Sequence, residues 1–478
     1  MNPGLVGIVI LSYFGLLILI SYLTSRNAES SDFYTANRSS RWYLVAFGMI
    51  GASLSGVTFI SVPGEVANSN FHYFQVVLGY LVGYWVIAKV LLPLYYKLNL
   101  VSIYTYLDQR FGFWSYKSGA FFFLISRIIG AGFRLFLVAG VLQIAFFDAF
   151  DLPFWISVLC TILLIWLYTF RGGIKTIVWT DTLQTAFMLI AVLISIFFIK
   201  DELSWTWTEL SSQVFADSRS TIFNWHWKSG NNFFKQFFSG AFIAIVMTGL
   251  DQDMMQKNLT CKNVGEAQKN VFWFCVILVA VNFLFLSLGV LLYQYAEIGG
   301  MSIPERSDSL FPFLAVNEFS SLGTISFLLG ITAAAYSSAD SALTALTTSF
   351  CVDFLGFEKE NYAEKKKLRM GVHFGFSIVL FFTILVFKAI NDESVITSIF
   401  KAAGYTYGPL LGLFAFGILT DWKVKDRFVP VLSILSPIIT YIINLNSEML
   451  FGGYKFGFEI LILNGLIMFL SLVLIRRK

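Results

Sequence analysis

Apolar stretches long enough to cross a bilayer dominate the sequence. They lie near residues 4–24, 42–66, 72–97, 118–147, 152–170, 174–199, 235–256, 266–296, 322–352, 367–389, 395–420, 427–446 and 456–475. A transmembrane helix needs about 20 predominantly apolar residues, and it satisfies its own backbone hydrogen bonds inside lipid. The pattern therefore predicts an all-α integral membrane protein with about 13 transmembrane helices.

The composition supports this class and excludes others. Hydrophobic residues make up 57% of the 478 residues and charged residues 13%, whereas soluble domains carry about 25% charged residues. The net charge of +4 is too small to indicate a nucleic-acid surface. The four cysteines and three histidines are scattered, and the sequence shows no nucleophile–base constellation. We therefore expect a protein that is not an enzyme and has no nucleic-acid partner.

Basic residues follow every second apolar stretch, which predicts an orientation. Cytoplasmic loops of membrane proteins carry an excess of Lys and Arg. The basic positions include Arg38, Arg41, Lys97, Arg110, Lys257, Lys262, Lys423, Arg427, Arg476, Arg477 and Lys478. We expect the N-terminus outside and the C-terminus in the cytoplasm. The first stretch has no cleavage site of a signal peptide, so we expect a retained helix in a bacterial plasma (inner) membrane.

Near residue 337 an apolar stretch becomes polar. Ala334, Ser337, Ser338 and Ser341 recur at helical spacing and share one helix face, and Asp340 lies beside them. Hydroxyls, a carboxylate and a backbone carbonyl make an all-oxygen patch, which hard cations such as Na⁺ prefer. Small residues also allow close helix packing in membranes. The residues of this patch could therefore bind an ion or allow close helix packing.

Glycines weaken two of the predicted helices near the middle of the membrane. The stretch 42–66 contains GASLSG at residues 51–56, and the stretch 235–256 contains Gly240 and Gly249. Paired interruptions at corresponding positions of two halves are typical of transporters, which bind their solutes there. The pattern favours an inverted repeat with a binding site beside the interruptions.

Arginine in mid-membrane is rare and usually faces a cavity or an opposite charge. Arg134 lies near the centre of the stretch 118–147, and Arg127 lies two turns earlier on the same face. Guanidinium binds carboxylates in a bidentate manner, so we expect Arg134 to bind a substrate carboxylate and Arg127 to be ion-paired or solvated. A structural pair of Arg134 with Asp181 or Asp340 is the alternative. Asp181 either completes a cation site or pairs with Arg127.

Further polar side chains lie close to the first interruption. Ser53, Ser55 and Thr58 add hydroxyls, and Phe71 and Gln75 lie at the outer start of the next stretch. Together with the arginine of the fourth stretch they would form a pocket for a polyhydroxylated acid.

Acidic residues follow the second interruption. Asp251, Gln252 and Asp253 end the stretch 235–256 on its cytoplasmic side. Because acidic side chains are rarely buried unless they are paired, we expect solvated helix-end residues here.

The motifs of the chain resemble those of the sodium:solute symporter family, which includes Na⁺-coupled carriers of sugars, proline, pantothenate, iodide and sialic acid. The resemblance is carried by GGIKTIVWTDTLQT at residues 172–185 and by AAAYSSADSALTALTTSFCVDF at residues 333–354. YTYLDQRFG at residues 104–112 and DQDMMQKNLTCKN at residues 251–263 also resemble loops of the family. It implies a LeuT-type fold of five plus five helices in an inverted repeat.

The resemblance divides a single transmembrane domain, residues 1–478, into two repeats and peripheral helices. Repeat one covers 42–199, repeat two covers 235–446, and the peripheral helices cover 4–24 and 456–475.

The resemblance also assigns ligands to Na⁺ as the coupling ion. The first site maps onto the carbonyl oxygens of Gly51, Leu54 and Ala334 and the hydroxyls of Ser337 and Ser338. A second site, present in some members, maps onto Asp181, Ser337, Asp340 and Ser341. Gly51 stands where the family usually has Ala, which leaves the carbonyl unchanged. Asp340 replaces a hydroxyl residue, and its charge favours a cation.

For function, the resemblance implies Na⁺-coupled import of a small organic solute by alternating access, by a monomer in the lipid bilayer. The residues that resemble the substrate pocket of sialic-acid carriers predict an acidic sugar such as sialic acid; they are Ser53, Ser55, Thr58, Phe71, Gln75 and Arg134. Carriers of neutral sugars usually have Asn-Gln where this chain has Asp251-Gln252. A symporter for a neutral sugar, an amino acid or another carboxylate is the alternative. A channel would lack saturable uptake, and a sensor would need a soluble signalling domain.

Overall fold

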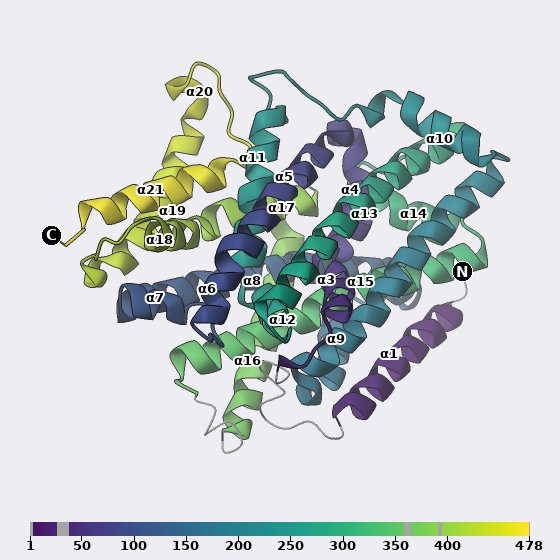
Figure 1. The fold of residues 1–478 in the computed structure, drawn as a ribbon. Coiled ribbons are helices and arrows are strands. Elements are labelled where there is room, and N and C mark those ends of the chain that lie inside the picture. Colours follow the sequence, from purple (N-terminus) through teal and green to yellow (C-terminus); the bar gives the residue numbers. More distant parts are fainter. Residues whose placement is uncertain (1–2, 26–37, 358–364, 391–393, 478) are drawn as a thin grey trace.

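The computed structural model is an assembly of helices (Figure 1). It describes residues 3–25, 38–357, 365–390 and 394–477, apart from the side chains of 3, 5, 24, 25 and 167–176. The principal helices are α1 (Pro3–Ser25), α3 (Trp42–Ser53), α4 (Gly56–Ser69), α5 (Tyr73–Val86), α6 (Leu92–Lys97), α7 (Thr105–Arg110), α8 (Phe113–Leu142), α9 (Phe154–Glu202), α10 (Trp207–Ala216), α11 (Phe233–Ala244), α12 (Gln252–Asn258), α13 (Val264–Ile298), α14 (Leu310–Asn317), α15 (Ser321–Ser349), α16 (Lys366–Ile390), α17 (Val395–Thr406), α18 (Gly408–Leu419), α19 (Val429–Leu445), α20 (Ser447–Leu450) and α21 (Ile460–Leu474).

Each predicted apolar stretch contains helix, but fewer helices qualify as membrane spans by length and composition. Among the described residues eight helices qualify, or up to ten if each bent pair counts as one span. Shorter apolar helices lie at Trp42–Ser53, Phe154–Trp166 and Ile460–Leu474. The predicted number of about 13 includes these shorter helices and the bent pairs. The predicted stretches 152–170 and 174–199 both lie in α9.

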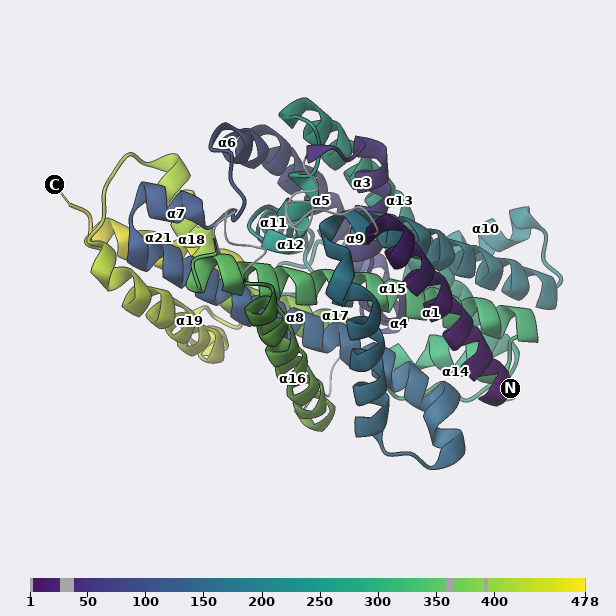
Figure 2. The same cartoon turned by 90° about the horizontal axis from the view of Figure 1, so that it is seen from below.

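α15 runs through the interior of the molecule (Figures 1 and 2). It packs against α3, α4, α8 and α9, and every residue from 331 to 349 is buried. A helix buried on all sides offers its polar side chains protein partners rather than lipid. The oxygen patch near residue 337 therefore lies inside protein.

In the part of the chain that the structure describes, three helices are broken inside the bundle. α3 and α4 are separated by Leu54 and Ser55. A π-helical turn extends α11 to Gly249, and α12 then leaves at 71°. α17 and α18 meet at Tyr407 with a bend of 50°. The predicted interruptions within residues 51–56 and beside Gly249 are confirmed.

Gly240 does not interrupt its helix, so that part of the prediction is wrong; it serves helix packing instead. A Cβ at Gly240 would lie 2.0 Å from the Val76 carbonyl oxygen, and a Cβ at Gly79 would lie 2.0 Å from that of Phe237. These distances leave no room for side chains, so α5 and α11 contact each other through their backbones.

Ion pairs hold the connection between α9 and α11. Arg219 lies 2.7 Å from Asp217 and 2.8 Å from Glu297, near the end of α13. The hydrogen bond from Arg219 lowers the pKa of Asp217 below its ordinary value. These contacts fasten the connection to α13.

Gly79→Ala is expected to destabilise the protein, although alanine is the better helix former. The added methyl would lie 2.0 Å from the Phe237 carbonyl oxygen, and overpacking costs roughly 1–3 kcal/mol. Gly375→Ala in α16 is the matched control because a Cβ there meets nothing within 4 Å. Thermal unfolding in detergent should show a lower midpoint for Gly79→Ala only. Equal midpoints would contradict the close backbone contact.

Candidate functional site

A cavity lies beside the break between α3 and α4. It offers about 80 Å³ to the centres of water-sized molecules, which is room for roughly half a dozen waters. Helices α5, α8, α11, α13 and α17 contribute the facing walls. The polar lining residues are Ser53, Ser55, Thr58, Tyr73, Tyr80, Tyr84, Arg127, Arg134, Thr248 and Asn282. The cavity therefore has the convergent polar groups of a solute-binding site, in a small volume.

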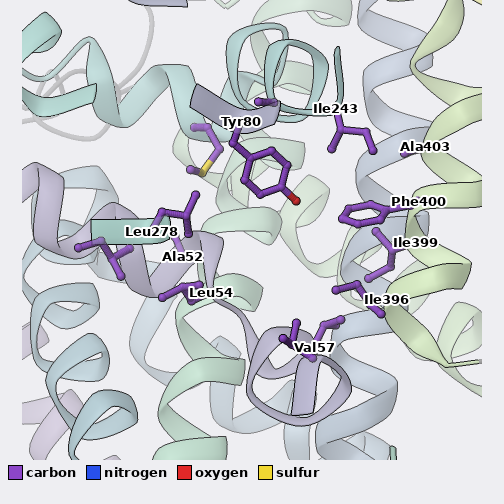
Figure 3. Close-up of a cluster of buried hydrophobic side chains, with 14 of the residues drawn as sticks. Ala52, Leu54, Val57, Tyr80, Ile243, Leu278, Ile396, Ile399, Phe400 and Ala403 are labelled. Atoms are coloured by element: carbon purple, nitrogen blue, oxygen red, sulfur yellow. The ribbon is translucent and has the colours of Figure 1, made fainter. Parts of the chain in front are cut away.

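Apolar side chains form much of the remaining wall. Figure 3 shows Ile399 and Phe400 on one side, Leu54 and Leu278 on the other, and the Tyr80 hydroxyl pointing toward Phe400. An apolar wall with a few oriented polar groups is typical of ligand sites in proteins.

Arg134 brings a positive charge to this cavity from α8. Its Nε has no hydrogen-bond partner among the described residues. The Nε of Arg127, also on α8, likewise has no partner among the described residues, but a terminal nitrogen of Arg127 donates a hydrogen bond to Asp253. The expected ion pair of Arg127 is therefore present, while the binding role of Arg134 stays a prediction.

A buried ion network lies at the end of the cavity nearest α12. Arg127 pairs with Asp253 and lies 3.8 Å from Asp251, which also accepts a hydrogen bond from Tyr407 at 2.7 Å. Asp251, Gln252 and Asp253 are at most 2% exposed. The prediction that they are solvated helix-end residues is wrong, because the bend before α12 turns them inward against a buried arginine.

A stacked aromatic pair separates the cavity from a second one. The ring centroids of Tyr73 and Phe400 lie 6.2 Å apart, with planes inclined by 14°. These rings and Ile396 line the central cavity and also a neighbouring cavity of about 190 Å³, which Glu65 and Lys401 line too. The ring pair is therefore the partition between the two spaces.

Phe71 and Gln75 lie outside the lining of the central cavity. The Gln75 amide donates to the Asn231 carbonyl oxygen and accepts from the Asn224 backbone N–H. Phe71 is buried against the ring of Phe283. Both side chains therefore serve packing and hydrogen bonding away from the cavity. Their predicted contact with the solute is absent from this arrangement.

The break after α3 brings backbone carbonyls to the oxygen patch of α15. The last carbonyls of a helix have no partner within it, and those of α3 include Gly51 and Ala52. Ser338 Oγ lies 3.3 Å from the carbonyl oxygens of Ala52 and Ala334, whereas hydroxyl hydrogen bonds are typically about 2.7–2.8 Å long. A hydroxyl and carbonyls from two helices make an oxygen donor set that fits Na⁺. The Ala52 carbonyl belongs to this set, although the sequence did not single it out.

Position 51 requires glycine for packing. A Cβ there would lie 2.2 Å from Thr185 Oγ1, and Thr185 is held by hydrogen bonds to the carbonyl oxygens of Phe47 and Asp181 at 3.0 and 2.7 Å. Alanine would offer the same carbonyl but would push α3 away from α9.

The second predicted cation site contains a lysine. Asp181 accepts hydrogen bonds from Lys257 Nζ and from Ser337 Oγ, each at 2.7 Å, through different carboxylate oxygens. The backbone N–H of Ser341 donates to Asp340. The alternative that Asp181 pairs with Arg127 is wrong, since lysine takes that place. Each Asp181 oxygen thus accepts one hydrogen bond, and one of the two donors is an ammonium.

Sequence reasoning missed several side chains of the site. Lys257 was taken for a cytoplasmic loop residue, yet it is 1% exposed. The signal that pointed to it was the buried Asp181, which needed a cation. Tyr73, Phe400 and Tyr407 carried no motif. Only the packing of distant helices brings Tyr73 and Phe400 to the cavity and Tyr407 to Asp251.

Comparison with known proteins gives a consistent result. The model of the sodium:solute symporter family matches residues 33–427. The sodium/sialic acid symporter NanT of Aliivibrio fischeri is 26% identical over 433 residues, which is 86% of this chain and 82% of that protein. Sodium-coupled monocarboxylate transporter 1 of Mus musculus is 26% identical. The match covers 82% of this chain and 65% of that transporter. The sodium/sialic acid symporter SiaT of Proteus mirabilis is 23% identical, with 86% and 84% of the two chains covered.

Solved structures show the same fold. The substrate-bound, outward-open structure of a Na⁺-coupled sialic acid symporter matches with a TM-score of 0.82, 18% identity and 99% of both chains covered. The closed structure of MHP1, a nucleobase-cation-symport-1 family transporter, matches with a TM-score of 0.55, 14% identity and 92% of both chains covered. The predicted all-α membrane fold of LeuT type is confirmed. The chain therefore belongs to the sodium:solute symporter family and is a multi-pass, Na⁺-coupled solute symporter, not an enzyme.

Proposed function

We propose that the solute is a small organic acid, and specifically an acidic sugar such as sialic acid. The observation that carries this proposal is Arg134, a guanidinium at the cavity whose Nε lacks a partner among the described residues. A buried polar group without a partner is costly, and a carboxylate would bind the guanidinium through two hydrogen bonds. Ser53, Ser55 and Thr58 offer hydroxyls to a polyhydroxylated ligand in the same cavity.

The names of three relatives agree with an acidic solute. NanT and SiaT are named for sialic acid, and the mouse relative is named for monocarboxylates. A carboxylate is the group that these solutes have in common, and it is the group that an arginine recognises best.

The Na⁺ that drives transport is proposed to bind at the α3–α4 break. The donors are the carbonyl oxygens of Gly51, Ala52, Leu54 and Ala334 and the hydroxyls of Ser337 and Ser338. The bound ion supplies a charge that draws the carbonyls of α3 and the oxygens of α15 together. The broken segment also carries Ser53 and Ser55 to the cavity, so one short segment serves ion and solute.

Two barriers at the cavity support alternating access. The stacked Tyr73 and Phe400 are proposed as the outer barrier, and the network of Arg127, Asp251 and Tyr407 as the inner one. Opening one barrier while the other stays closed exposes the solute to one side of the membrane at a time. The solute shifts the equilibrium between the two open states only if it binds one of them more tightly.

The arrangement of the chain in the membrane is part of the same proposal. We expect the N-terminus outside, the C-terminus in the cytoplasm, and a bacterial inner membrane. The breaks before α4 and before α12 fall in the first helix of each predicted repeat, 42–199 and 235–446, which supports the inverted repeat. One copy contains the cavity and both barriers, so we expect a working monomer.

A shorter carboxylate is the second candidate. The apolar side chains of Ile243, Ile396 and Ile399 cover much of the cavity, and such a wall suits an aliphatic acid better than a ring with several hydroxyls. Neutral sugars and amino acids are the remaining candidates, and for a neutral sugar Arg134 would have no ionic partner.

Arg134→Ala should lower uptake of the acidic solute at least about 30-fold, because removing one partner of a buried charge pair costs about 2–5 kcal/mol. Arg134→Lys keeps the charge but loses the bidentate geometry, so its uptake of the acidic solute should lie between that of Arg134→Ala and that of wild type. The measurement is Na⁺-dependent uptake into proteoliposomes of sialic acid, a short monocarboxylate, an amino acid and a neutral sugar.

The exposed Arg427 in the turn before α19 provides the control, since Arg427→Ala should transport as wild type does. If the Arg134→Ala variant still takes up the acidic solute, Arg134 has a structural role and does not bind the solute. The preferred solute of the wild-type chain decides between the sugar acid and the shorter acid.

Ser338→Ala should raise the Na⁺ concentration for half-maximal uptake at least about tenfold, because a hydrogen-bonding partner of a charged group contributes about 1.5–3 kcal/mol. Ser337→Ala combined with Ser338→Ala should abolish Na⁺-dependent uptake at normal expression. Ser195→Ala is the matched control, since this buried serine in α9 bonds only its own helix, at the Ala191 carbonyl oxygen. If uptake by the double variant depends on Na⁺ as in wild type, Ser337 and Ser338 do not bind the coupling ion.

A further inference from the structure

Lys257 is buried in the centre of the transporter, at the place that the sequence assigned to a second Na⁺. It is 1% exposed, and its carboxylate partner Asp181 is 0% exposed. The ammonium of Lys257 lies 2.7 Å from Asp181 Oδ2, and Ser337 Oγ donates to Asp181 Oδ1 at 2.7 Å. One positive charge thus binds the carboxylate that a second Na⁺ would need.

The lysine reaches this position from α12, the inner half of the bent pair. Every residue of α12 is buried, and the helix packs against α3, α9, α13 and α15. Asp253 and Asp340 are the other acidic groups whose charges act on Lys257. Asp253 is paired with Arg127, so Asp181 is the carboxylate that Lys257 contacts.

An ammonium and a Na⁺ ion make similar demands on a protein. Both carry one positive charge and both bind carboxylate and hydroxyl oxygens. They cannot share one carboxylate in a low-dielectric core without strong repulsion, because like charges at contact distance are poorly screened there. The ammonium has the advantage of being attached to the protein, so it loses no translational freedom on binding.

We propose that the Lys257 ammonium replaces the second Na⁺ and that the chain binds a single Na⁺, at the α3–α4 break. Ser337 donates its proton to Asp181, so its hydroxyl oxygen remains available as an acceptor toward the first site. Ser338 faces that first site. This inference rests on the proposed first Na⁺ site and concerns the number of ions, not the identity of the solute.

Lys257 also ties three elements together in a way that a free ion would not. Its backbone belongs to α12, its partner Asp181 to α9, and the second donor to Asp181, Ser337, to α15. A covalently attached cation cannot leave to the cytoplasm with the solute. Release of Na⁺ therefore occurs at the first site, while the lysine stays with the chain.

The test is equilibrium binding of ²²Na⁺ to the purified full chain in lipid nanodiscs, without solute. Wild type should bind one Na⁺ per chain at saturation. Lys257→Ala should bind two, because Asp181 then lacks a cation and the space of the side chain is free. Lys257→Ala combined with Asp181→Asn should return to one. Lys262→Ala is the matched control, since this nearby lysine is exposed, and it should bind one.

Two results would overturn the proposal: two Na⁺ bound by wild type, or no added Na⁺ in a folded Lys257→Ala chain. Should Lys257→Ala not fold, Lys257→Arg keeps the charge in place and should still bind one ion, and the wild-type count remains decisive. A wild type that binds none while Lys257→Ala binds one would support the replacement of the ion by Lys257 and overturn the proposed first site. Uptake assays do not enter this test, so an error in the proposed solute leaves its outcome unchanged.

Discussion

A backbone group that leaves its helix inside a membrane protein must find another partner, and this constraint shapes the centre of the transporter. At the break before α12, tyrosine hydroxyls donate to the carbonyl oxygens of Gly249 and Leu250 at 2.8 and 2.9 Å. At the break between α17 and α18, the Asn464 side chain donates to the carbonyl oxygens of Gly404 and Tyr405 at 3.0 and 2.9 Å. Both breaks are therefore closed by the protein itself, and α21, which carries Asn464, acts as a brace for the second.

The break between α3 and α4 is different. The hydroxyl of Ser338 lies 3.3 Å from the Ala52 carbonyl oxygen and is shared with that of Ala334. Among the described residues, the donor at the Ala52 carbonyl is therefore a weak one. A cation meets several carbonyls at once, which a single hydroxyl cannot do. The carbonyls at the other two breaks accept short hydrogen bonds from neutral side chains. The Ala52 carbonyl has only a weak donor and lies among oxygens that suit Na⁺, which favours an ion at this break.

The sequence was informative where the chemistry is local and less so where it depends on tertiary contact. GASLSG predicted the first break because glycine and serine weaken a helix in place, and helical spacing put Ser337 and Ser338 on one face. The burial of Asp251 and Lys257 was missed, because a bend of 71° before α12 turns a segment that reads as a charged loop into the core. Gln75 was misplaced toward the solute for the same kind of reason. Its amide is engaged by residues about 150 positions away in the sequence, which no local pattern reveals.

Ion and solute meet the protein at the same broken segment, and this has a thermodynamic consequence. Ser53 lines the cavity, while the adjoining Ala52 carbonyl faces the oxygen patch. Ordering this segment for one ligand removes part of the conformational cost for the other, which is a source of coupling without any direct contact between them. The coupling is reciprocal, so the factor by which Na⁺ raises solute affinity is the factor by which solute raises Na⁺ affinity. A change in the geometry of the break should therefore weaken both affinities together. Arg134 lies on α8 and not on the broken segment. Its loss should therefore weaken the affinity for the solute alone and leave the binding of Na⁺ without solute intact.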